Sequence, residues 1–95
     1  TSAVEKDGVQ YVSSTLRSGQ YPDITVKAGE PVKWEIQAPE GSINGCNYKM
    51  ILGDFGMEYT FENGKNTLEF TPEKAGTYIY TCWMGMITGT IYVTE

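Results

Sequence analysis

The chain has 95 residues, the size of one domain, and we expect residues 1–95 to form a single folded unit. Its net charge is −5 and its seven Lys and Arg residues form no cluster, which argues against a nucleic-acid partner. It contains no histidine, so the commonest general base and the commonest ligand of Zn²⁺ and Cu(II) are absent.

Short segments rich in Val, Ile, Thr, Tyr and Phe alternate with turns that contain Gly or Asn, which is typical of an all-β protein. The clearest segment is 31–37, where Val32, Trp34 and Ile36 alternate with polar residues and predict one buried face. Seven or eight short strands in so short a chain indicate a Greek-key β-sandwich or barrel. We predict strands over residues 9–16, 23–27, 31–37, 48–52, 57–61, 67–71, 77–82 and 88–94, and no helix longer than a turn or two.

Three sulfur-bearing residues lie close together in the run Thr81-Cys82-Trp83-Met84-Gly85-Met86. In an extended backbone Cys82, Met84 and Met86 would project to one side. Gly85 would let the chain bend, so that both thioethers wrap round a small ion. A thiolate combined with thioethers is a soft ligand set, which selects Cu(I) among the biological metals. The motif therefore predicts a Cu(I) site.

The second cysteine, Cys46, follows Asn44-Gly45 in a loop after segment 31–37. Because the loops of a sandwich cluster at the ends of its sheets, we expect Cys46 to face Cys82. Two thiolates would make a tight Cu(I) site, and the surplus sulfur suggests a second ion that shares a Cys sulfur. The expected metal ligands are Cys46, Cys82, Met84 and Met86.

The four methionines also have a plainer interpretation, because Met is a flexible residue that fills gaps in cores. Met84 and Met86 taken alone would be read as core residues, and only their spacing from Cys82 favours a metal site. We interpret Met50 and Met57 as packing residues, although Met50 lies close enough to Cys46 to contribute.

The rival interpretation of the two cysteines is a structural disulfide. Tyr80 lies two residues before Cys82, as in the tyrosine corner of immunoglobulin domains. The alternative function is therefore an immunoglobulin-like interaction module without a metal. Against it, no Trp follows the first cysteine at the expected place, since Trp34 precedes Cys46 and Trp83 adjoins the second cysteine. We expect Trp83 to cover the site and exclude water, with partner docking as the alternative role.

Two further sets of residues form recognisable motifs: Phe70-Thr71-Pro72, Gly76, Tyr78, Tyr80, Cys82 and Ile91-Tyr92-Val93, and the earlier segment Ile24-Thr25-Val26-Lys27-Ala28-Gly29-Glu30-Pro31-Val32. With these motifs most of the chain, from about Tyr21 to the end, resembles the cupredoxins. The blue copper members of that family bind copper through one Cys, two His and a weak axial Met. In this sequence Met84 replaces the His after Cys82, Met86 corresponds to the axial Met, and Cys46 takes the upstream His position. The loss of both imidazoles argues against electron transfer.

Cys46 together with the Cys-x-Met-x-Met motif resembles a Cu(I)-binding subset of these domains. That subset comprises the membrane-anchored Cu(I) chaperone of streptococcal copper resistance and the N-terminal metal-binding domain of its partner, a Cu(I)-exporting P-type ATPase. The resemblance implies two copper ions, with Cys46 and Cys82 holding the tight one and Met84 and Met86 helping to hold the weaker one.

The same resemblance implies how such a domain works in the cell. It implies a monomer at the cytoplasmic face of the membrane, tethered by a segment outside this chain, that sequesters Cu(I) or passes it on by ligand exchange. The implied partner is the Cu(I)-exporting ATPase or its chaperone. We expect no enzymatic activity of the domain itself, because the sequence shows no nucleophile–base pair and no phosphate-binding loop.

Overall fold

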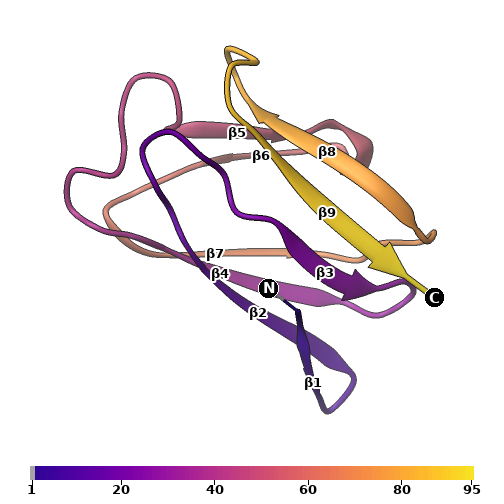
Figure 1. The fold of residues 1–95 in the computed structure, drawn as a ribbon. Coiled ribbons are helices and arrows are strands. Elements are labelled where there is room, and N and C mark those ends of the chain that lie inside the picture. Colours follow the sequence, from indigo (N-terminus) through magenta and orange to yellow (C-terminus); the bar gives the residue numbers. More distant parts are fainter. Residues whose placement is uncertain (1) are drawn as a thin grey trace.

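The computed structural model describes residues 2–95, which form two β-sheets packed face to face (Figure 1). The predicted all-β class is confirmed, and the one helical element in this part of the chain is the 3₁₀ turn η1 (Gly53–Phe55). The strands are β1 (Val4–Lys6), β2 (Val9–Thr15), β3 (Ile24–Lys27), β4 (Val32–Ala38), β5 (Lys49–Leu52), β6 (Met57–Thr60), β7 (Gly64–Phe70), β8 (Gly76–Cys82) and β9 (Thr88–Thr94).

All eight predicted strands are present, and the ninth, β1, was not predicted. Its three side chains are all exposed, so it has no alternation of buried and exposed residues that a sequence pattern would reveal. The largest difference in bounds is at β7, which begins at Gly64 rather than Thr67.

The two sheets have the strand orders β1-β2-β4-β7 and β3-β9-β8-β5-β6. The pairs β2–β4 and β3–β9 are parallel, and the other pairs are antiparallel. The chain crosses from one sheet to the other after β2, β3, β4, β6 and β7. Two of these connections, β2–β3 and β4–β5, meet the β8–β9 loop at one end of the sandwich (Figure 1).

The core lies between the sheets and is centred on Trp34, whose side chain is fully buried. Strand β4 alternates buried and partly exposed residues as predicted, which directs Val32, Trp34 and Ile36 inward. The ring of Tyr80 packs edge-on against Trp34, with 5.6 Å between ring centroids, and stacks on Tyr21 at 5.3 Å. The aromatic residues of both sheets therefore fix how the layers face each other.

A buried polar residue, Gln10, joins the two sheets along one edge. Its side-chain oxygen accepts the backbone N–H of Lys27 at 2.6 Å, and its amide group donates to the carbonyls of Lys27 (2.8 Å) and Glu30 (3.2 Å). The Gln10 side chain thus makes, at Lys27 of β3, the backbone hydrogen bonds that a neighbouring strand would otherwise make. Because each buried polar atom finds a partner, the bridge avoids the free-energy cost of an unpaired group.

A close approach between Tyr80 and Gly89 shapes the end of β8 that carries Cys82. The two residues are directly paired across β8 and β9. A Cβ atom on Gly89 would lie 2.5 Å from the Tyr80 ring, so the tyrosine can occupy this position only opposite glycine. The Tyr80 hydroxyl donates to the carbonyl of Pro22, and this bond ties β8 to the segment that leads into β3.

Candidate metal centre

Cys46 lies in the β4–β5 loop, and Asn44 shapes the backbone around it. The Asn44 side-chain oxygen accepts the N–H groups of Cys46 (2.9 Å) and Asn47 (2.8 Å), while the Asn47 side-chain oxygen accepts the Asn44 N–H at 2.8 Å. Asn side chains commonly close turns by bonding backbone two or three residues away. The reciprocal pair folds residues 44–47 into a tight turn that leaves Cys46 partly exposed.

Asn47 also fixes this turn to the body of the protein. Its side chain is fully buried and donates to the carbonyls of Ser42 (2.7 Å) and Arg17 (3.4 Å). Its own carbonyl accepts the hydroxyl of Tyr21 at 2.9 Å. We did not predict this role, although two Asn residues three positions apart around a Gly-Cys pair are a recognisable turn signal.

Cys82 is the last residue of β8, and its side chain is only 1% exposed. Its sulfur accepts the backbone N–H groups of Met86 (3.3 Å) and Ile87 (3.4 Å). These amides point at the sulfur because the chain reverses at Gly85, whose φ is 73° and whose N–H donates to the Cys82 carbonyl at 2.9 Å. Glycine reaches this left-handed conformation without steric cost.

The Cys46 and Cys82 sulfur atoms lie 3.4 Å apart, as the sequence predicted for facing residues. Both are free thiols, since a disulfide bond requires a separation of about 2.05 Å. Burial opposes ionisation of Cys82, but hydrogen bonds from the backbone of Ile87, from the Cys46 thiol and from the backbone of Met86 lower its pKa to about 7. The hydrogen bond to Cys82, followed by desolvation, raises the pKa of Cys46, so Cys82 ionises first.

Met84 and Met86 do not belong to the core, because their side chains are 50% and 75% exposed. The extended arrangement that would project them to one side with Cys82 is wrong, since β8 ends at Cys82 and the next residues form turns. The bend expected at Gly85 is present. The loop therefore turns back at Gly85, and this turn brings the backbone N–H of Met86 to 3.3 Å from the Cys82 sulfur.

The other candidate residues have clear positions. Met50 is fully buried opposite Cys82 on β5, and Met57 is partly buried, as expected for packing residues. Trp83 is 49% exposed, and its indole N–H donates to the carbonyl of Gly45 at 3.1 Å. Within residues 2–95, no three His, Cys, Asp or Glu side chains converge to form a metal site.

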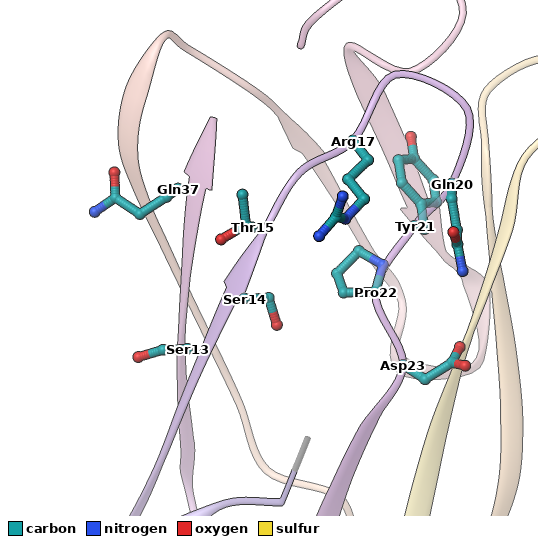
Figure 2. A pocket seen from close by; sticks show the side chains of 9 residues that line it. All are labelled: Ser13, Ser14, Thr15, Arg17, Gln20, Tyr21, Pro22, Asp23 and Gln37. Carbon is teal, nitrogen blue, oxygen red and sulfur yellow. The ribbon is translucent and has the colours of Figure 1, made fainter. Parts of the chain in front are cut away.

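A separate cleft of about 430 Å³ opens beside the edge of β2 and contains none of the four candidate ligands (Figure 2). It is lined mostly by polar residues, with Ser13 and Thr15 of β2 on one side and Arg17, Pro22 and Asp23 of the β2–β3 connection on the other. Of the two cysteines, Cys46 is partly exposed on the β4–β5 loop, whereas Cys82 is buried at the end of β8. No helix within the described residues is long and apolar enough to cross a membrane.

Comparison with solved structures identifies the fold. A copper-binding protein, determined by NMR in the apo form, superposes with a TM-score of 0.84 at 24% identity and covers 98% of this chain and 95% of its own. The reduced form of an amicyanin mutant, a cupredoxin, gives a TM-score of 0.52 at 21% identity, with 94% and 85% covered. The fold is cupredoxin-like. The resemblance that the sequence motifs carried is thus confirmed for the fold.

A third neighbour is the metal-binding domain of the Cu(I)-exporting P-type ATPase CopA of Streptococcus pneumoniae D39, solved with Cu(I). It superposes with a TM-score of 0.84 at 19% identity and covers 99% of this chain and 94% of its own. The sequence matches no protein-family model and no curated protein. Identities this low show the fold alone, so the chemistry of the site has to be argued from its own residues.

Proposed function

We propose that this domain binds Cu(I) through the thiolates of Cys46 and Cys82, with help from Met84 and Met86. The observation that carries the proposal is the pair of free sulfur atoms 3.4 Å apart at a loop-covered end of a cupredoxin-like sandwich. Two solved structures with this fold, a copper-binding protein and the Cu(I)-loaded metal-binding domain of CopA, support the proposal.

The donor set suits a soft, monovalent ion. Thiolates and thioethers select Cu(I), whereas Zn²⁺ sites generally use four N, O or S ligands and Cu(II) favours imidazole. A thiolate–metal bond is roughly 2.3 Å long in zinc sites. Two sulfurs sharing an ion at about that bond length would lie about 3.8 to 4.6 Å apart, depending on the angle. Because their sulfurs lie 3.4 Å apart, Cys46 and Cys82 need to separate by only about 0.4 to 1.2 Å to admit an ion between them.

The exposed methionines suggest a second, weaker ion. Cys82 belongs to the same turn as Met84 and Met86, and the backbone N–H of Met86 already contacts its sulfur. We infer from this proximity in the chain that Cys82 bridges the two ions, while Cys46 contributes to the first ion only. Thioethers bind without losing a proton, so the second ion would be held by one shared thiolate and two neutral donors, and would exchange faster.

Copper is cargo in this account. A partner's sulfur atoms can replace Met84, Met86 and then Cys46 one at a time, so that Cu(I) moves without release into solution. The partner is a Cu(I)-exporting P-type ATPase or its chaperone, and the domain acts as a monomer at the cytoplasmic face of the membrane. The fold shared with a domain of such an exporter supports this choice of partner.

Titration of the fully reduced protein with Cu(I) against a chromophoric chelator tests the proposal. We expect one tightly held ion and one weaker ion per chain. Saturation at one ion would refute the bridged pair, and failure to compete with the chelator would refute Cu(I) binding. Counting free thiols before and after addition separates the alternative, because an immunoglobulin-like module with a native disulfide would show no reactive thiol and no response to Cu(I).

A further inference from the structure

The indole of Trp83 connects the two loops that carry the cysteines. Trp83 directly follows Cys82, and its backbone N–H donates to the carbonyl of Lys49 at 3.0 Å, which anchors it to β5. Its indole N–H reaches across and donates to the carbonyl of Gly45 at 3.1 Å. Gly45 directly precedes Cys46, so this bond joins the immediate neighbours of the two thiols.

The same ring contacts the Cys46 loop at a second point. The Trp83 and Tyr48 rings pack edge-on, with 6.1 Å between centroids and 63° between planes. Gly45 and Tyr48 lie on either side of Cys46 in the sequence. The indole therefore holds the tip of the loop on both sides of the thiol, through one hydrogen bond and one aromatic contact.

The remaining bonds of the loop do not control the spacing of the two sulfurs. Asn44 and Asn47 tie it to the β2–β3 connection through the carbonyls of Ser18 and Arg17. Among residues 2–95, the hydrogen bonds that link residues 42–47 to residues 82–87 are the one from Trp83 and the contact between the sulfurs themselves. Once an ion separates the sulfurs, Trp83 is the hydrogen-bonded link that remains.

We propose that Trp83 is a positioning residue, which holds the Cys46 loop at the distance at which both thiolates share one Cu(I) ion. The expected effect of Trp83 on Cu(I) affinity rests on the proposed function, whereas its expected effect on the mobility of the copper-free Cys46 loop does not. With the bond in place, Cys46 starts close to Cys82 and little ordering is needed when copper enters. A partner that receives copper must first draw Cys46 away, against this bond.

The test compares the wild-type domain with Trp83→Phe, which keeps an aromatic ring but loses the N–H donor. A second variant places β-(3-benzothienyl)alanine at position 83, which keeps the bicyclic ring and also lacks the donor. Tyr92→Leu, which alters an exposed aromatic residue on the outer face of β9, is the matched control. A net hydrogen bond contributes about 0.5–1.5 kcal/mol, so we expect both Trp83 variants to bind Cu(I) about two- to tenfold more weakly.

The copper-free proteins give an independent readout, because backbone NMR relaxation reports mobility at Gly45 and Cys46 directly. Both Trp83 variants should increase mobility at these two residues and leave Asn66, on strand β7 of the other sheet, unchanged. Unaltered mobility together with unaltered Cu(I) affinity would overturn the positioning role, as would a loss of affinity shared by Tyr92→Leu. If the wild type binds no Cu(I), the proposed function fails. Increased mobility in the variants would still support a role of Trp83 in holding the Cys46 loop.

Discussion

The sulfur of Cys82 accepts two backbone N–H groups, whereas the sulfur of Cys46, 3.4 Å away, has Cys82 as its one hydrogen-bonding partner within the described chain. The two thiols, 36 positions apart in sequence, are therefore not equivalent. The buried sulfur of Cys82 is held by two backbone amides, whereas Cys46 lies at the tip of the β4–β5 loop. This difference suggests that Cys82 retains copper while Cys46 is the first thiolate to be exchanged.

Replacing Cys46 with Ser should abolish tight Cu(I) binding and leave the fold intact. Cys46 is only partly buried, and its backbone is held by Asn44 rather than by its own side chain. Chelator competition should show loss of the tight ion, and thermal unfolding of the copper-free protein should stay within about 0.5 kcal/mol of wild type, as for most surface changes. Retention of tight binding by Cys46→Ser would remove Cys46 from the ligand set.

Replacing Met84 and Met86 together with Leu should weaken the second copper ion and spare the first. Leu keeps the apolar character of Met but has no sulfur, and both positions are exposed, so stability should change little. Native mass spectrometry at rising Cu(I) should show one ion per chain where the wild type shows two. Met57→Leu, in a packing methionine, is the control and should keep both ions. Unfolding of the double variant would place these residues in the core instead.

Removing the buried amide of Asn47 should damage both stability and copper binding. Asn47→Ala leaves the Ser42 carbonyl and the Asn44 N–H without their partners, which should cost about 2–3 kcal/mol in unfolding free energy. Because the Cys46 turn would loosen, Cu(I) affinity should also fall about tenfold or more, the range seen for residues that orient metal ligands. Urea unfolding and chelator competition measure the two effects.

Asn66→Ala is a matched control for that experiment. Asn66 is also buried and donates to the carbonyls of Ile36, Glu62 and Gly64, but it organises the β6–β7 connection. It should cost a similar free energy of unfolding while Cu(I) affinity stays at the wild-type value. An equal loss of affinity in both variants would mean that general destabilisation, rather than the Cys46 turn, explains the effect.

Adding a methyl group at Gly89 should destabilise the domain. A Cβ atom there meets the Tyr80 ring at 2.5 Å, and overpacking of this kind typically costs about 1–3 kcal/mol. Gly19→Ala is the control, because its added Cβ meets no atom within 4 Å and its φ is not left-handed. Thermal unfolding should separate the two variants clearly, and equal melting temperatures would show that Tyr80 can move aside without loss of packing.

Much of the sandwich could be predicted because its strands alternate cleanly. Val32, Trp34 and Ile36 carry the period of two that a half-buried strand requires. Strand β1 could not be predicted, since a three-residue edge strand with only exposed side chains has no such period. The bridge made by Gln10 was equally hidden, because its partners at Lys27 and Glu30 are set by the packing of the sheets.

The candidate site was predictable in its composition but not in its conformation. The density of sulfur around Cys82 and the lack of histidine pointed to the residue types, and the clustering of sandwich loops placed Cys46 nearby. The shape of the Cys82 loop was not predictable from alternation, because Gly85 turns the chain at the point where the strand ends. The bond from Trp83 to Gly45 depends on how two distant loops meet, which no local pattern contains.

The most direct test of the central claim is X-ray absorption spectroscopy of the reduced domain loaded with Cu(I). We predict a first shell of sulfur atoms only, and at two ions per chain an additional copper–copper distance from the shared thiolate of Cys82. Loading Cys46→Ser should change the sulfur count and remove the copper–copper signal. A first shell made of oxygen or nitrogen, or a domain that retains no copper, would contradict the account.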